Sequence, residues 1–136
     1  MSPVVRNVLA VLAGVAVGTI VNMGIIQLSG SIIPPPEGID PSDMESIKAN
    51  AHLLEAKHFI FPFLAHAMGT LIGAYTAVRF AANNHKNLAL GIGGWFLLGG
   101  IAAVFLIGGP LWFTVLDLGL AYIPMGLLGW MLAKKE

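Results

Sequence analysis

Apolar residues form four blocks of helix length along this chain, and shorter polar segments separate them. The blocks occupy about residues 8–28, 59–81, 88–107 and 111–133. A helix rises 1.5 Å per residue, so about 20 residues are enough to cross the hydrocarbon core of a bilayer. The pattern therefore predicts an all-α fold, a polytopic transmembrane four-helix bundle that forms a single membrane domain over residues 1–136.

The most polar stretch lies between the first two blocks, and it predicts an extracytoplasmic loop and helix over residues 34–58. This stretch begins with three consecutive prolines, which lack backbone donors, so the first helix has to end before them. Ser42 and Glu45 have the spacing of a capping box, which predicts that the Ser42 hydroxyl caps the next helix. That helix is expected to be amphipathic and continuous to His58, and Pro62 is expected to kink it into the second span.

The composition agrees with a membrane protein and narrows its chemistry. The chain is 57% hydrophobic and only 10% charged, whereas a soluble domain is about a quarter charged. Its net charge is zero, so it has no basic face for nucleic acid, and the lipid bilayer is its predicted partner. The absence of cysteine excludes disulfides, thiolate nucleophiles and thiolate metal ligands. No cofactor is predicted.

The basic residues predict the orientation of the four spans. Most of them fall on one side of the predicted membrane: Arg6, Arg79, Lys86, Lys134 and Lys135. Only Lys48 and Lys57 fall on the other side, within the long acidic loop. Because positive charge is enriched in cytoplasmic segments, the N and C termini are expected in the cytoplasm and the acidic loop outside.

Small residues recur every four positions in the first two spans and predict close helix packing. Gly14 and Gly18 form a GxxxG pattern in the first span, and Gly69 and Gly73 repeat it in the second. Such residues let two helix backbones approach closely in lipid. Packing within the chain is the favoured interpretation, and a homodimer seam is the alternative. Asn22 continues the first pattern and is expected to donate an interhelical hydrogen bond.

Asp117 is the sharpest candidate for chemistry within the membrane, because an acidic side chain inside a span is costly. One hypothesis is a proton or cation site formed with His66 of the second span. The alternative is a packing role, in which Asp117 fastens helices together by bonding Asn22, His66, Thr70 or Tyr122.

Three residues of the polar stretch form the pattern H-x-x-E-x-x-H: His52, Glu55 and His58. Zinc accepts such ligands, but the two histidines diverge by about 120 degrees on a helix. A further ligand such as Glu37 or Asp43 would be needed, so a solvated charged face is the favoured interpretation. The carboxylates of Glu37, Asp40 and Asp43 are also candidates for acid–base chemistry or calcium binding. Their spacing matches no complete EF-hand, and turns and caps account for Asp40 and Asp43.

The loop PPPEGIDPSD at residues 34–43 follows a glycine-patterned span and precedes AHAMGTLIGAY at residues 65–75. In these segments and in its overall span pattern, the chain resembles a widespread group of small bacterial four-span membrane proteins. The resemblance covers most of the chain and implies a location in the bacterial inner, or plasma, membrane. It implies no activity, substrate or catalytic residue.

These patterns support hypotheses of three different classes. The leading one is a non-enzymatic membrane protein that acts through helix packing, as a homo-oligomer or as an accessory subunit of a larger membrane complex. The second is a small carrier or channel for protons, cations or a small solute that uses Asp117 and His66. The third is an enzyme on a lipid or envelope substrate, with the acidic and histidine residues of the loop converging outside the membrane.

Overall fold

The computed structural model describes residues 1–134, and all the secondary structure within this range is helical. As the sequence predicts, four segments are long and apolar enough to cross a membrane. They are α1 (Pro3–Ile32), α3 (Ile60–Phe80) with the turn before it, α4 (His85–Leu106), and α5 (Leu111–Leu120) with α6 (Ile123–Lys134).

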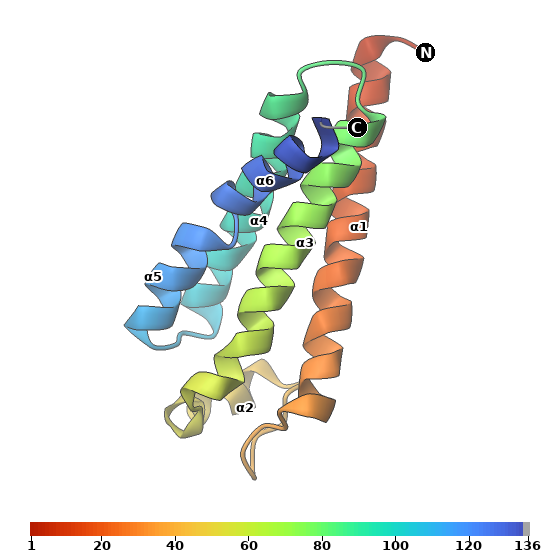
Figure 1. Cartoon of the computed structure of the whole chain (residues 1–136). Helices are drawn as coiled ribbons and strands as arrows, with labels where there is room; N and C mark the ends of the chain where they lie inside the picture. The colour runs from red at the N-terminus through yellow and green to blue at the C-terminus, as the bar shows by residue number, and fades with distance from the viewer. Residues whose placement is uncertain (135–136) are drawn as a thin grey trace.

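Helix α3 lies in the middle of the bundle, with α1 on one side and with α4 and α6 on the other (Figure 1). The start of α1 and the end of α6 lie at one end of the bundle, here named the terminal end, which also carries the turn between α3 and α4. The opposite end, named the loop end, carries the segment 33–59 and the turn between α4 and α5. Both α3 and α5 run from the loop end towards the terminal end.

The small-residue seams of the first two spans meet each other within the chain. A Cβ atom added to Gly14 would lie 2.6 Å from the carbonyl oxygen of Gly73, and one added to Gly18 would lie 2.6 Å from that of Gly69. Real side chains do not approach backbone this closely, so α1 and α3 can pack at this distance only because these positions are glycine. These glycines therefore form the contact between α1 and α3 within the chain, rather than a seam on the bundle surface.

The start of α1 is also tied to the end of α3 at the terminal end. The Asn7 side chain accepts a hydrogen bond from the backbone N–H of Ala82 (2.8 Å) and donates one to the side chain of Asn83 (2.8 Å). Arg6 donates from Nε to the carbonyl oxygen of Phe80, at 2.8 Å. These bonds satisfy backbone groups that a helix end leaves without partners, and they fix the register of α1 on α3.

The predicted Ser42 cap is wrong by one residue. Asp43 is the N-cap of α2 (Met44–Ala49), and its carboxylate accepts from the backbone N–H of Glu45 at 3.0 Å. Ser42 instead donates to the Asp40 carboxylate, from its backbone N–H at 2.9 Å and from its hydroxyl at 2.6 Å. A carboxylate is a strong acceptor, so the Ser42 hydroxyl bonds to the Asp40 carboxylate within this turn and does not cap the helix. The same two bonds lower the pKa of Asp40 below its ordinary value.

The predicted continuous helix up to His58 is also wrong. Helix α2 ends at Ala49, because Asn50 caps it and donates from its side chain to the Ser46 carbonyl oxygen at 2.9 Å. Asparagine competes in this way for helix backbone groups and favours helix ends. Two short 3₁₀ helices follow, η1 (Ala51–Leu53) and η2 (Ala56–Phe59).

Pro62 does not produce the predicted kink. It lies in the first turn of α3, two residues after the first helical residue, Ile60. Backbone N–H groups of a first turn have no partner within the helix, so a proline there costs no hydrogen bond. The chain before α3 forms the two 3₁₀ helices instead of a longer helix that Pro62 could bend.

The fourth span, expected as one unit over residues 111–133, is broken near its middle. Helix α5 ends at Leu120 and α6 begins at Ile123, with Ala121 and Tyr122 between them. Pro124 explains the break, because it lacks the N–H that would bond to the carbonyl of Leu120 and its ring clashes with that carbonyl. The break leaves Ala121 and Tyr122 buried against the neighbouring helices.

Candidate functional site

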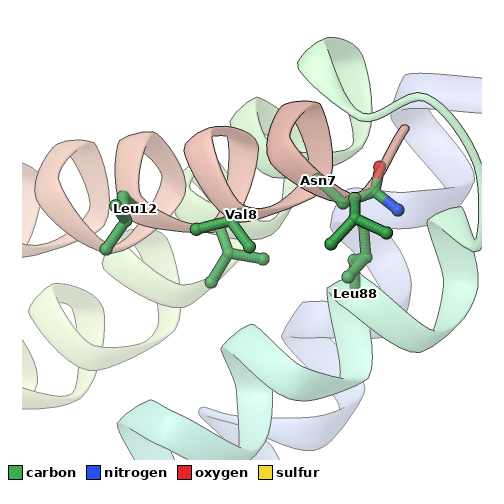
Figure 2. Close-up of a pocket in the computed structure, with 6 residues that line it drawn as sticks. Asn7, Val8, Leu12 and Leu88 are labelled. Atoms are coloured by element: carbon green, nitrogen blue, oxygen red, sulfur yellow. The ribbon is translucent and has the colours of Figure 1, made fainter. Parts of the chain in front are cut away.

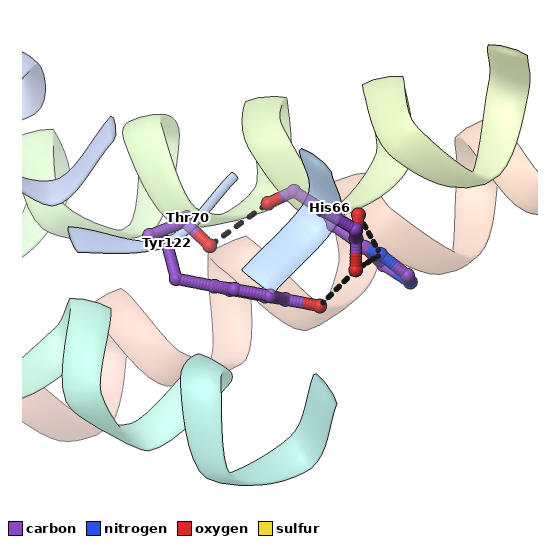
Figure 3. Close-up of polar contacts among 4 residues, drawn as sticks. His66, Thr70 and Tyr122 are labelled. Atoms are coloured by element: carbon purple, nitrogen blue, oxygen red, sulfur yellow. Dashed lines mark hydrogen bonds and ion pairs between the residues drawn. The ribbon is translucent and has the colours of Figure 1, made fainter. Parts of the chain in front are cut away.

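The bundle brings His66 of α3 and Asp117 of α5 together within the membrane-spanning region. His66 Nδ1 lies 2.8 Å from Asp117 Oδ1 and 3.0 Å from Oδ2 (Figure 3). Each residue lies six positions after the first residue of its helix, Ile60 or Leu111. Both helices run in the same direction, and each side chain lies about 9 Å along the axis from the first residue of its helix at 1.5 Å per residue.

Tyr122 completes this group, and the break in the fourth span positions it. Its hydroxyl donates to Asp117 Oδ2 at 3.1 Å, and its ring stacks on the His66 ring with centroids 5.7 Å apart. Gly100 of α4 provides the space for the tyrosine ring, because a Cβ atom added there would lie 2.5 Å from the Tyr122 hydroxyl oxygen. Asp117 therefore has partners from α3 and from the break, and α4 closes the site around Tyr122.

Thr70 and Asn22, the other predicted intramembrane candidates, do not bond to Asp117. Thr70 is fully buried, and its hydroxyl donates to the His66 carbonyl oxygen one turn away, at 2.8 Å. Asn22 lies beside Gly69 in the contact between α1 and α3. Its side-chain oxygen is buried and has no hydrogen-bond partner within residues 1–134. This oxygen therefore accepts no interhelical hydrogen bond among the described residues.

The burial of the group determines what it can do chemically. Asp117 is 4% exposed, and the His66 side chain retains 24% of its surface. An ionised carboxylate can only accept hydrogen bonds, and the Tyr122 hydroxyl and a protonated His66 Nδ1 both suit it as donors. In a medium with little water, neither charge is stable without the other. The arrangement can hold a proton between an imidazole and a carboxylate that are already in contact.

The outer-loop candidates do not form a comparable cluster. Five of them are exposed and one, His58, is half-buried: Glu37, Asp40, Asp43, His52, Glu55 and His58. No three His, Asp or Glu side chains within residues 1–134 come together in a way that could hold a metal ion. The 3₁₀ helices disrupt the H-x-x-E-x-x-H spacing, and His58 Nδ1 accepts the backbone N–H of Glu55 at 2.8 Å instead. The convergence required for the enzyme hypothesis is therefore not found in this part of the chain.

One cavity lies near each end of the bundle. One, of about 310 Å³, lies at the terminal end between α1 and α4, and Figure 2 shows Asn7, Val8, Leu12 and Leu88 in its wall. Its lining includes no titratable side chain, so it offers no acid–base chemistry. The other, of about 400 Å³, lies at the loop end, where His52 and Trp112 contribute to its wall. Neither cavity is lined by His66 or Asp117.

Sequence reasoning identified Asp117, His66 and Tyr122 as possible partners but missed how Tyr122 and Gly100 fit together. Pro124, two residues after Tyr122, was the available signal for the break. The contact with Gly100 depends on how α4 is rotated, and no residue pattern carries that information. No family model, curated protein or solved structure matches this chain.

Proposed function

We propose that this chain is a small membrane carrier for protons, in which the pair formed by His66 and Asp117 takes up and releases the proton. The 2.8 Å contact between these two ionisable side chains inside two membrane spans is the observation that carries the proposal. Ionisable residues in such positions are costly to maintain and commonly mark ion pathways and proton relays. The Tyr122 hydroxyl supports the carboxylate in its charged form.

A proton fits this site better than a metal cation or a larger solute. A hard cation needs several oxygen ligands, and this group offers one carboxylate and one hydroxyl. A larger solute needs a cavity, and neither cavity includes the pair in its lining. A proton needs only a donor and an acceptor in hydrogen-bond contact, as His66 and Asp117 are.

A purely structural role explains the pair less well. Replacing a buried ion pair by apolar side chains of similar size is often neutral or stabilising, because two charges no longer have to be removed from water. Helix packing alone therefore gives little reason for a carboxylate and an imidazole at this depth. At the seam between α1 and α3, by contrast, glycines let the two helix backbones approach closely without an ionisable pair between them.

Proton uptake into liposomes that contain the purified protein tests the proposal. A pH-sensitive dye inside the liposomes should report uptake with the wild type, and Asp117→Asn should slow it by roughly a hundredfold, the scale on which positioned acid–base groups act. Asp43→Asn is the matched control, since asparagine caps a helix as well as aspartate does. Equal uptake by the wild type and Asp117→Asn would contradict the proposal.

Helix packing as a homo-oligomer or as an accessory subunit of a larger complex is the second candidate function. Gly91 and Gly99 of α4 support it, because both are exposed and neither has another part of the chain within 4 Å of an added Cβ. Small residues on a lipid-facing helix surface allow another helix to approach closely. Native mass spectrometry tests this candidate: a dimer or a co-purifying subunit would support it, and a strict monomer would contradict it.

We further propose that the protein lies in a bacterial inner membrane, with both termini in the cytoplasm and the acidic loop outside. Four basic side chains at the terminal end support this orientation: Arg6, Arg79, Lys86 and Lys134. Basic residues beside the ends of membrane spans favour the cytoplasmic side.

A further inference from the structure

The loop-end cavity is formed where the segment before α3 meets the turn between α4 and α5. Its volume is about 400 Å³, which falls within the range of small-molecule sites in proteins. Its wall consists of Ala51, His52, Leu54, Ala56, Phe59, Gly109, Pro110 and Trp112. His52 and Trp112 are exposed, so the cavity is open to its surroundings at this end of the bundle.

An aromatic contact adjoins the wall of this cavity. The rings of Phe59 and Phe113 are 4.7 Å apart between centroids, and Trp112 packs edge-on against Phe59 at 5.5 Å. Phe59 belongs to the cavity wall, whereas Phe113 is half-buried and is not part of that wall. The pair formed by these two phenylalanines, here named the aromatic barrier, therefore extends from the cavity wall to a half-buried residue of α5.

The positions along the chain place the aromatic barrier on the loop-end side of His66 and Asp117. Phe113 precedes Asp117 by four residues, so it lies about one turn closer to the loop end on the same face of α5. Phe59 is the last residue of η2 and the N-cap of α3, and it precedes His66 by seven residues on the loop-end side. Both pairs are in contact across the two helices, Phe59 with Phe113 and His66 with Asp117.

The distances to the two ends of the bundle favour access from the loop end. His66 lies six residues, or about 9 Å, from the start of α3, but 14 residues, or about 21 Å, from its end at Phe80. Between His66 and the terminal end, the core is filled by fully buried side chains, among them Thr70, Ala74 and Ile92. Between His66 and the loop end lie the cavity and the aromatic barrier.

We propose that the loop-end cavity is the opening through which protons reach His66 and Asp117, and that the aromatic barrier restricts passage from the cavity to this pair in this structure. This inference rests on the proposed proton-carrier function and adds the route to the site. An apolar constriction excludes water, so proton transfer has to wait until the two rings separate. The exposed imidazole of His52 contributes a polar side chain to the wall of this cavity.

Chemical modification of the native histidines tests the route without substituting His66 or Asp117. The full-length protein in lipid nanodiscs is treated with diethyl pyrocarbonate, and mass spectrometry gives the rate at His66 relative to the exposed His85. Phe113→Ala and Phe59→Ala should raise that ratio by about tenfold, equivalent to lowering the barrier by about 1.4 kcal/mol. Phe105→Ala is the matched control, because Phe105 is 81% exposed on α4 and lies outside the aromatic barrier.

A variant that blocks the cavity provides the opposite test. Ala56 is an exposed residue of the wall, so Ala56→Trp adds bulk there without changing the core. It should lower both the modification of His66 and the rate of proton uptake into liposomes, whereas Phe113→Ala should raise both. The route is wrong if the alanine variants and Ala56→Trp all leave the modification of His66 at the wild-type rate.

The two readouts separate this inference from the proposed function. If Phe113→Ala exposes His66 but Asp117→Asn takes up protons like the wild type, the carrier function fails and the cavity leads only to a structural pair. If Asp117→Asn abolishes uptake while His66 modification does not respond to the aromatic variants, the carrier function stands and the route proposed here is overturned.

Discussion

At the scale of single residues, Asp117 is notable because each of its contacts comes from a different structural cause. His66 reaches it because α3 and α5 start at the same end of the bundle and run in parallel. Tyr122 reaches Asp117 because Pro124 breaks the fourth span, and Tyr122 lies in that break. The sequence indicated that an intramembrane carboxylate needs partners. Which of the candidate partners it would find depended on helix rotation, which residue types do not encode.

Gly100→Ala is expected to disturb the site through Tyr122. The added Cβ would lie 2.5–2.7 Å from atoms of the Tyr122 side chain, so the ring has to move away from Asp117. Such overpacking costs about 1–3 kcal/mol, which exceeds the gain of up to about 1 kcal/mol from replacing glycine in a helix. Thermal unfolding in detergent should therefore show a lower midpoint for Gly100→Ala than for the wild type.

Gly99→Ala is the control for this prediction, because the neighbouring glycine has open space around its added Cβ. It should retain or slightly raise the unfolding midpoint. If both alanine variants behave alike, the ring of Tyr122 is not held against Gly100 as described.

Among the helices, apolar block length predicted all four spans, whereas the ends of the shorter helices depend on local competition for hydrogen bonds. Asp40 takes the Ser42 hydroxyl, and Asn50 takes a helix carbonyl, so the predicted long amphipathic helix becomes α2 and two 3₁₀ helices. Apolar spacing predicts which face of a helix is buried, but it does not predict which acceptor a hydroxyl group bonds to. The break before Pro124 is the one such detail that a residue type signals directly.

Gly18→Leu should separate α1 from α3. The carbonyl oxygen of Gly69 lies 2.6 Å from the position of the new Cβ, and backbone cannot move aside as a side chain can. The variant is expected to lose about 1–3 kcal/mol of stability or more, measured by thermal or denaturant unfolding in micelles. Gly24→Leu, in the same helix but with nothing within 4 Å of its added Cβ, should unfold like the wild type. A wild-type stability for Gly18→Leu would show that the seam is not close-packed.

At the scale of the whole molecule, charge and chemistry are distributed along the axis of the bundle. Within residues 1–134, every acidic side chain except Asp117 lies in the segment 33–59, and the terminal end carries only basic ones. The ion pair lies between these two ends, closer to the loop end. The direction in which the bundle is inserted therefore decides whether the loop-end cavity opens to the outside or to the cytoplasm.

The positive-inside rule predicts that the terminal end faces the cytoplasm. Because the chain has no cysteine, single substitutions allow a direct measurement: Glu37→Cys marks the loop end, and His85→Cys marks the terminal end. In intact bacterial cells, a membrane-impermeant maleimide should label Glu37→Cys and should label His85→Cys only after permeabilisation. The reverse pattern would mean an inverted bundle, and protons entering the loop-end cavity would then come from the cytoplasm. Labelling of both positions in intact cells would contradict a fixed four-span orientation, because four crossings put the two ends on opposite sides of one membrane.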